Sequence, residues 1–321
     1  MKYRFLAVLH NMELESIKNK GIELYPGARI SNKNDKTEQI LSDINYIAIL
    51  GAHPVDEFND AVYIYIDREI DDIKDKQEMD LVGDKYAFHH LREAQTFLHE
   101  LWLIKDNNVY VRDGFLIAYD QKIEDGFVFK ASLSEVYTYA SREEKKTLFM
   151  DSEIISAASN FSQFEIENRK DKDFGGKIPQ ADHFYKSNGY TRLDRATYFV
   201  MGARRDATLP MKILSYCTAL ECLFTTGSAE ITHKISERIA TLLGTTKESR
   251  IEIYEVIRDA YKCRSKIVHG QHLSGTDEDL VSISVRVDEI LRELLNSENE
   301  IFLKNDKEID AYFIELLFDA D

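Results

Sequence analysis

Two hydrophobic patterns divide the chain. In its first part, short runs rich in β-branched and aromatic residues occur at 3–9 and 61–66, and two more lie within 109–119, on either side of the pair Asp113 and Gly114. Such runs are typical of strands, and an Asp-Gly pair is typical of a hairpin turn. Between them, residues 86–104 have apolar positions at the spacing of an amphipathic helix. The pattern predicts a small sheet with a helix packed on it.

From about residue 152 the pattern is helical, interrupted by a loop that contains Gly and Pro at 173–179. Ser228 and Thr276 are each followed by acidic residues and are predicted N-caps, and Gly244 is predicted to end a helix in a left-handed conformation. The helices are predicted at 192–203, 209–224, 228–243, 247–268, 277–296 and 308–318. Such a series indicates an antiparallel helical bundle.

We therefore predict an α+β N-terminal domain over residues 1–150, followed by an all-α helical bundle over 151–321. With 321 residues, of which 44% are hydrophobic, the chain can fill the cores of two ordinary domains. Its longest apolar runs fall well short of the roughly 20 residues that span a membrane, and no charged and then apolar leader opens it. We expect a cytoplasmic protein without a membrane partner.

Histidine and cysteine spacing gives no sign of a metal site. The three cysteines, Cys217, Cys222 and Cys263, lie in helical apolar contexts without a CxxC pair, so we expect reduced core residues. Two adjacent histidines in the predicted helix 86–104, His89 and His90, are expected to point to different sides of that helix. No metal or other cofactor is expected.

The net charge of -16 argues at first against a nucleic-acid partner, since phosphate binding draws on basic surfaces. The charges are, however, unevenly distributed along the chain. Residues 207–276 hold nine Lys and Arg against seven Asp and Glu, whereas residues 277–321 hold four against fourteen. The acidic excess is therefore concentrated in the last segment of the chain.

Arg264 and His269 lie five residues apart at the end of the predicted helix 247–268. Taken alone, they fit an arginine that caps the last carbonyls of a helix beside a histidine packed on an apolar face. Five residues, at about 100° each, put two side chains about 140° apart. We therefore expect the pair to share one small site only if the helix end bends or unwinds, for which Gly270 gives freedom.

Three blocks in order resemble the Apea-like branch of the HEPN superfamily. The first two are residues 219–223 and 232–244, and the third is residues 261–270. The third contains Arg264-Ser265-Lys266-Ile267-Val268-His269-Gly270, which resembles the Arg-x4-6-His motif of HEPN ribonucleases. The likeness covers about residues 209–295. It implies a helical bundle that forms a homodimer in which the motifs of both protomers face one cleft.

The resemblance also implies metal-independent RNA cleavage, with Arg264 and His269 as catalytic residues. The 2'-hydroxyl of RNA can attack its own phosphate, so a protein need only move protons and stabilise charge. Histidine suits the proton transfers near neutral pH, and arginine suits the phosphorane oxygens. Many active members have Asn, Asp or His where this chain has Ser265. A serine can still donate or accept a hydrogen bond.

Four further residues are candidates for a supporting or RNA-binding role. Lys266 lies within the motif, and Glu221 on the predicted helix 209–224 is positioned to pair with Arg264 or to be an ordinary carboxylate at the surface. On the helix 228–243, His233 and Arg238 either line the same cleft and contact RNA or help that helix pack against its neighbours.

Two functional hypotheses follow. The first is a metal-independent endoribonuclease that acts as a homodimer and leaves 2',3'-cyclic phosphate ends, as an anti-phage or growth-arrest toxin whose N-terminal domain senses a regulatory protein or phage trigger. The second is a non-catalytic HEPN module that binds nucleotides or a protein partner. The acidic net charge and Ser265 favour the second.

Overall fold

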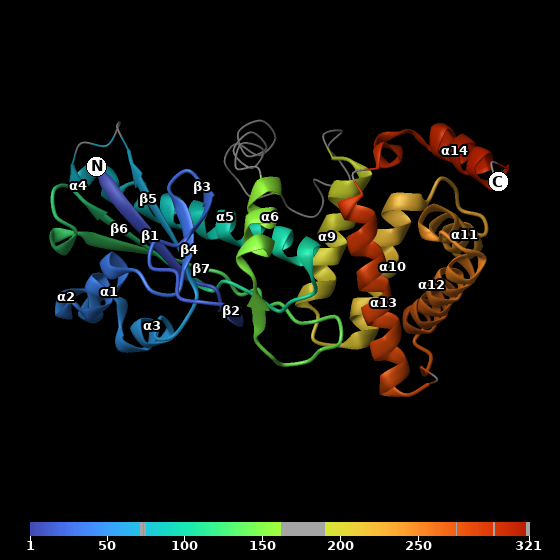
Figure 1. The fold of residues 1–321 in the computed structure, drawn as a ribbon, viewed down its shortest axis with the longest axis horizontal. Helices are drawn as coiled ribbons and strands as arrows, with labels where there is room; N and C mark the ends of the chain where they lie inside the picture. The colour runs from blue at the N-terminus through green and yellow to red at the C-terminus, as the bar shows by residue number, and fades with distance from the viewer. Residues whose placement is uncertain (71–72, 74, 162–189, 274, 298, 319–321) are drawn as a thin grey trace. The chain divides into compact units, whose positions relative to one another are not determined.

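The computed structural model describes residues 1–70, 73, 75–161, 190–273, 275–297 and 299–318. These residues form two compact units (Figure 1). The first comprises Met1–Tyr137 with Glu144–Asn168, and the second comprises Thr138–Glu143 with Arg169–Asp321. The predicted loop 173–179 lies outside the described residues. The predicted fold class, an α+β part followed by an all-α part, is confirmed.

A six-stranded antiparallel sheet forms the first unit, with the strand order β3-β4-β5-β1-β6-β7. The central strand β1 pairs on both sides, so that Lys2 lies opposite Glu69 of β5 and Tyr119 of β6. The strands are β1 (Lys2–Val8), β3 (Ile22–Tyr25), β4 (Ala28–Ser31), β5 (Tyr63–Glu69), β6 (Asp113–Tyr119) and β7 (Phe127–Ser132).

Helices cover both faces of this sheet (Figure 1). Leu6 and Val8 of β1 belong to the core shared with α1 (Asp35–Ser42), α2 (Ile44–Leu50) and α3 (Ala52–Glu57). Phe5 points to the opposite face, where its ring lies 5.5 Å from that of His90 on α5 (Gly83–Ile104). Successive side chains of β1 point to opposite faces of the sheet, so this strand contributes to two cores. Each fully buried large apolar side chain stabilises the fold by about 1.5–3 kcal/mol.

The first unit continues past the predicted domain limit at residue 150. Strand β2 (Met12–Leu14) pairs in parallel with β8 (Thr147–Phe149), and α6 (Asp151–Asn160) follows directly. Glu153 of α6 accepts from Lys105 Nζ at 2.6 and 2.8 Å, and this ties α6 to the end of α5. The short elements α4 (Lys76–Asp80) and η1 (Ile123–Asp125) complete the unit.

The hairpin predicted at Asp113 and Gly114 is wrong, because both residues begin strand β6. A Cβ on Gly114 would lie 2.7 Å from the ring of Phe5. The glycine is therefore required by the close approach of an aromatic ring on the neighbouring strand, not by a turn. Tyr110, in the other predicted run, forms only an isolated bridge with His10.

The second unit is entirely helical in its described part. Its predicted helices 209–224, 247–268 and 277–296 are confirmed at both ends. The helices are α9 (Arg192–Arg205), α10 (Leu209–Phe224), α11 (Ile231–Leu243), α12 (Lys247–Val268), α13 (Asp277–Asn296), η2 (Glu300–Leu303) and α14 (Asp306–Phe318).

Of the three predicted caps, Thr276 is confirmed, Ser228 is wrong, and Gly244 ends its helix as predicted but not in the left-handed conformation. Thr276 caps α13 in a reciprocal pair with Asp279. Helix α11 begins at Ile231 after Glu230, in the left-handed conformation at φ 54°, and not after Ser228. Gly244 ends α11 at φ -77°, outside the left-handed region. A Cβ at this position would lie 2.6 Å from the Ala240 carbonyl oxygen, so glycine is required here by close packing and not by backbone conformation.

Buried polar groups join α10 to α13 within the second unit. Tyr216 Oη donates to Asp288 Oδ1 at 2.9 Å, and Arg292 pairs with the same carboxylate. Asp288 is 1% exposed, so these two donors replace the water that its carboxylate loses on burial. The segment Thr138–Glu143 is fastened to the same helices, since Ser284 Oγ donates to the Ala140 carbonyl at 2.8 Å.

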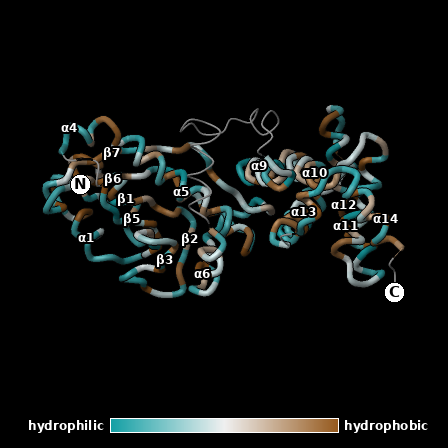
Figure 2. The backbone as a smooth tube through the Cα atoms, turned by 90° about the horizontal axis from the view of Figure 1, so that it is seen from above, coloured by the Kyte–Doolittle hydropathy of each residue, from teal (hydrophilic) through white to brown (hydrophobic). Residues whose placement is uncertain are grey.

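Hydrophobic and hydrophilic stretches alternate along the backbone of both units (Figure 2). Among the described residues, no helix combines the length and the apolar content needed to cross a bilayer.

Two Gly→Ala substitutions test the packing argument in opposite directions. Gly114→Ala should lower the free energy of unfolding by about 1–3 kcal/mol, because Phe5 is fully buried and has no room to move. Gly202→Ala, in α9, should raise it by about 0.5–1 kcal/mol, because a Cβ there meets nothing within 4 Å. Urea unfolding followed by Trp102 fluorescence and circular dichroism measures both, and equal effects would contradict the packing argument.

Candidate functional site

The candidate residues Arg264 and His269 lie on α12, which packs through one apolar face. Thr246 begins the helix by accepting from the Ser249 backbone N–H at 3.1 Å. The buried positions that follow recur at helical spacing and include Ile253, Ile257 and Ala260. This face holds α12 in the bundle and leaves its other sides available for chemistry.

Helix α12 ends in a regular capping motif. Gln271 N–H donates to the Lys266 carbonyl at 2.8 Å, and Gly270 N–H donates to the Ile267 carbonyl at 3.1 Å, with Gly270 at φ 63°. This pair of hydrogen bonds is a Schellman motif, in which a left-handed glycine closes the helix. His269 is the last residue before that glycine, so the helix does not bend or unwind between Arg264 and His269.

Arg264 faces helix α10, where its Nη2 lies 3.4 Å from Glu221 Oε1. The side chains are 34% and 23% exposed, so the pair lies at a partly open edge between the two helices. Tyr261, one turn earlier, donates to the Cys217 carbonyl of α10 at 3.3 Å. The predicted pairing of Arg264 with Glu221 is therefore present, and it fixes the direction of the guanidinium.

His269 and Ser265 are exposed. Among the described residues, the ring of His269 has no hydrogen bond or ion pair. Lys266 is half-buried. The imidazole therefore meets solvent, while Arg264 lies about 140° away around the helix. One protomer does not bring the two side chains to one point.

The remaining two candidates are occupied elsewhere. His233 is exposed on α11, with its Nδ1 3.0 Å from Tyr254 Oη on α12. Arg238, 8% exposed, donates to the Phe224 carbonyl at 2.7 Å and pairs with Asp310 of α14. No contact in the described part of the chain joins either residue to Arg264 or His269. Arg238 thus caps α10 and holds α14 to it.

The cysteines of this unit are not poised as nucleophiles. Burial raises the pKa of the Cys217 thiol far above its usual range, and burial raises the pKa of Cys222 to about 11. At neutral pH both therefore stay protonated. The chemistry available at the edge of α10 and α12 is that of Arg264, Glu221, Ser265 and an exposed imidazole.

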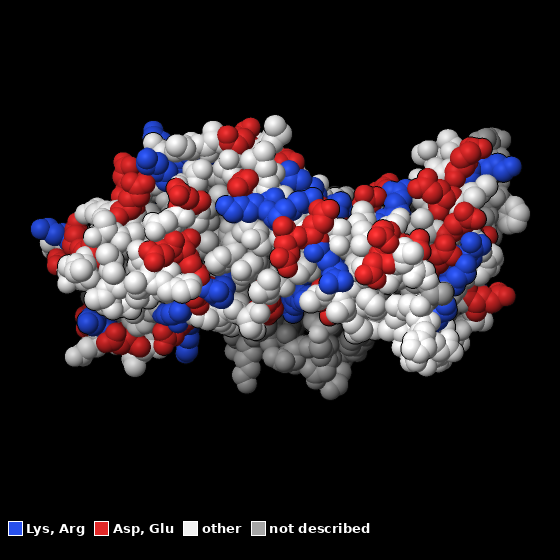
Figure 3. Space-filling model, turned by 90° about the horizontal axis from the view of Figure 1, so that it is seen from below, with Lys and Arg blue, Asp and Glu red and all other residues white. Residues whose placement is uncertain are grey.

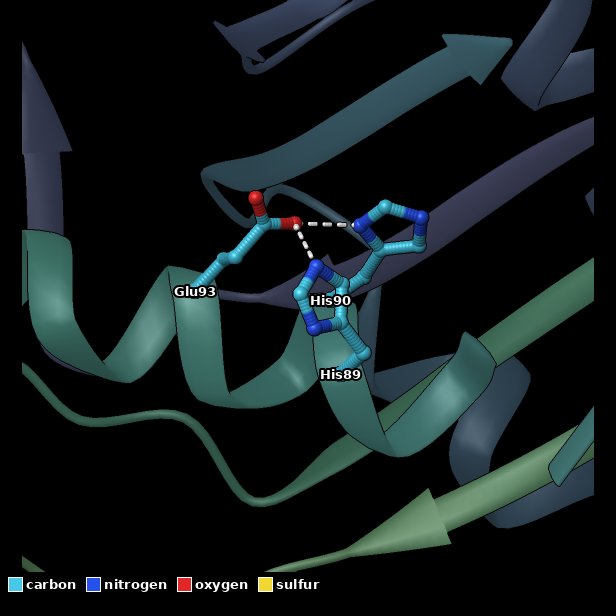
Figure 4. Close-up of side chains that lie close together, drawn as sticks. All are labelled: His89, His90 and Glu93. Carbon is cyan, nitrogen blue, oxygen red and sulfur yellow. Dashed lines mark hydrogen bonds and ion pairs between the residues drawn. The ribbon is translucent and has the colours of Figure 1, made fainter. Parts of the chain in front are cut away.

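A second cluster, which the sequence did not reveal, lies on α5 of the first unit (Figure 4). His89 and His90 were expected to point apart, and this is wrong, since both rings turn toward the Glu93 carboxylate. The reason is helical spacing, because Glu93 lies four residues after His89 and three residues after His90, on the same side of the helix. Tyr3 Oη, from β1, lies 2.7 Å from His90 Nε2.

These three side chains have the composition of a zinc-binding set, and their ligand atoms lie within 4.8 Å of one another. His90, however, uses both ring nitrogens within the protein, one toward Tyr3 and one toward Glu93. Burial alone would raise the pKa of Glu93, but the hydrogen bond with His90 and the charges of both imidazoles lower it overall. We interpret the cluster as a network that keeps a fully buried carboxylate ionised.

Comparisons with known protein families, with curated proteins and with solved structures find no match to this chain.

Arg264 and Arg238 should differ sharply in their effect on stability. Arg264→Ala removes a partly exposed ion pair and should lower the free energy of unfolding by about 1 kcal/mol or less. Arg238→Ala leaves the Phe224 carbonyl without its donor and should lower it by about 2 kcal/mol. Urea unfolding monitored by circular dichroism measures both, and a larger loss for Arg264→Ala would show that Arg264 is chiefly structural.

Glu93 should stabilise the first unit in a pH-dependent way. Because its pKa is lowered on folding from about 4.5, its contribution is fully present above that pH and is lost as the pH falls through the folded-state pKa. Glu93→Gln should therefore be less stable than wild type at neutral pH, with a difference that shrinks in acid. Trp102 fluorescence during urea unfolding reports this, and exposed Glu69→Gln is the control. A pH-independent difference would contradict the interpretation.

Proposed function

We propose that the second unit is a metal-independent endoribonuclease that acts as a homodimer. The observation that carries the proposal is the end of α12, where an exposed imidazole follows, by five residues, an arginine held by a carboxylate. This arrangement occurs in a segment whose sequence resembles the HEPN motif. RNA is the substrate class that it fits, because RNA carries its own nucleophile.

The reaction requires two proton transfers and no metal. The 2'-oxygen attacks the adjacent phosphorus as its proton passes to a base, and the bond from phosphorus to the 5'-oxygen breaks as that oxygen receives a proton from an acid. The products are a 2',3'-cyclic phosphate and a 5'-hydroxyl. His269, exposed and without a hydrogen-bond partner among the described residues, is available for proton transfer.

Arg264 supplies charge stabilisation. Its guanidinium can donate two parallel hydrogen bonds to the phosphorane oxygens, and contact with Glu221 on one side leaves other N–H groups for a substrate. Ser265, exposed beside Arg264, can donate a further hydrogen bond to RNA.

Two copies of the chain complete the site in this proposal. Because the regular helix end keeps Arg264 and His269 about 140° apart, His269 of one protomer would act beside Arg264 of the other. A two-fold axis near the ends of the two α12 helices produces two such composite sites.

The surface charge is compatible with RNA despite the net charge of -16. On the face drawn in Figure 3, basic and acidic groups are interspersed. Near the motif, Lys262 pairs with Asp259 at 2.7 Å, an exposed contact that a phosphate can replace. The proposal therefore predicts RNA binding that weakens steeply with added salt.

We extend the proposal to a cytoplasmic growth-arrest or anti-phage effector, the setting that the resemblance implies. The first unit would then respond to a regulatory protein or phage trigger, since the imidazole of His90 and the carboxylate of Glu93 in its α5 are hydrogen-bonded to each other, and the imidazole also to Tyr3.

One observation favours a second candidate, a non-catalytic module that binds nucleotides or a protein partner. The regular end of α12, closed by the Schellman motif, keeps Arg264 and His269 apart within one protomer. A monomer would therefore contain both residues of the motif but would not bring them together in one site. The same cleavage experiment distinguishes the two candidates.

Purified protein incubated in EDTA with single-stranded and structured RNA should cleave it and leave 2',3'-cyclic phosphate ends. His269→Ala should reduce the rate about 100-fold or more, because proton transfer by a positioned side chain contributes about that much. His272→Ala is the matched control, since it removes another exposed histidine three residues away. End-labelled RNA on a denaturing gel measures the rates.

Equal cleavage by wild type and His269→Ala would contradict the catalytic assignment. Absence of cleavage by the wild type, together with nucleotide or protein binding that depends on Arg264, would favour the binding module.

A further inference from the structure

A hollow of about 640 Å³ opens on the first unit, where the start of α1 and the loop before β3 meet the strands β1, β4 and β5. It lies on the face of the sheet opposite α5, because its wall includes Arg4, whose neighbour Phe5 points toward α5. Four cationic side chains line it: Arg4, Lys20, Arg29 and Lys36. In a chain with a net charge of -16, this concentration of positive charge is unusual.

The floor of the hollow is rigid. Arg4 is 3% exposed and donates to both oxygens of Asp67, at 2.8 and 2.6 Å. Its Nη1 donates to Asn34 Oδ1 at 2.8 Å and to Thr37 Oγ1 at 3.0 Å, and its guanidinium lies 4.6 Å from the centre of the Tyr65 ring. A charged group is therefore fixed at the base of the hollow before any ligand arrives.

The loop that carries Lys20 is fastened to this floor. Tyr65 Oη donates to the Lys20 carbonyl at 2.8 Å, and Asn34 Nδ2 donates to the Asn19 carbonyl at 2.9 Å. Gly21 has φ 70°, and a Cβ on it would lie 2.9 Å from the Ile30 carbonyl, so the loop approaches β4 as closely as glycine allows. The loop backbone is thus ordered in advance, which reduces the entropy lost on binding.

The cations are only partly neutralised. Lys36 shares Asp67 with Arg4, at 3.5 Å, and Arg29 pairs with Glu23, whose side chain is 51% exposed. The described residues provide no carboxylate partner for Lys20. Of the described residues that line the hollow, Asp35 is the one with a carboxylate. Positive charge therefore exceeds negative charge around this space.

We propose that this hollow binds the phosphate group of a small organic phosphate. The ammonium of Lys20 and the guanidinium of Arg29 would bind the phosphate oxygens. The volume lies within the range of about 300–1,000 Å³ found for small-molecule sites. This site is separate from the endoribonuclease proposal and does not depend on it.

Titration calorimetry of the full chain with pyrophosphate tests the proposal. Pyrophosphate should bind saturably, and Lys20→Ala combined with Arg29→Ala should weaken binding about tenfold or more, a loss of about 1.4 kcal/mol. Lys33→Ala is the matched control, because Lys33 is an exposed lysine of the neighbouring segment that does not line the hollow. It should leave the affinity unchanged.

Two results would overturn the proposal: no saturable binding of pyrophosphate to the wild type, or equal binding by the wild type and the double variant. Trp102 fluorescence verifies that the double variant is folded. Should it not fold, Lys20→Gln alone removes the exposed charge and should still weaken binding, and unchanged affinity in that variant would likewise reject the site.

Discussion

The regular geometry of α12 is the constraint on which the functional account depends. Hydrogen bonds keep the helix regular until Gly270 closes it, so each residue is turned by about 100° from the one before. Arg264 consequently faces Glu221 on α10, and His269 meets solvent on another side. In the proposed endoribonuclease, a site that uses both residues would therefore draw on a second copy of the chain. Dimerisation would then be part of the proposed chemistry and not only of assembly.

Arginines have two distinct physical roles in this chain. Arg4 and Arg238 are buried, and each satisfies backbone or side-chain acceptors that would otherwise lack a donor. Arg264 is a third exposed, and Glu221 is its one ion-pair partner in the described part of the chain. Burial explains why the first two maintain the fold, since an unpaired buried partner is costly. A partly exposed ion pair, such as that of Arg264, contributes little stability and leaves donors free for a ligand.

The sequence predicted most of the helices because their apolar periodicity is a local property, and three helices of the second unit begin and end where that pattern does. The pairing of Arg264 with Glu221 was also among its predictions. It missed features set by distant neighbours. The Asp113-Gly114 pair was taken for a turn because the approach of Phe5 cannot be seen locally. Likewise, the gathering of cations around the hollow depends on tertiary packing. The convergence of His89 and His90 on Glu93 follows from helical spacing, which the sequence contains but which we did not apply to this carboxylate.

The central claim, that Arg264 of one protomer works with His269 of the other, is tested most directly by mixing two inactive variants. Arg264→Ala and His269→Ala protomers, unfolded together and refolded as one pool, would form mixed dimers that each contain one intact composite site. The account predicts that the pool regains about a quarter of wild-type cleavage activity, as random pairing of two protomers requires. A pool as inactive as either variant alone would contradict it.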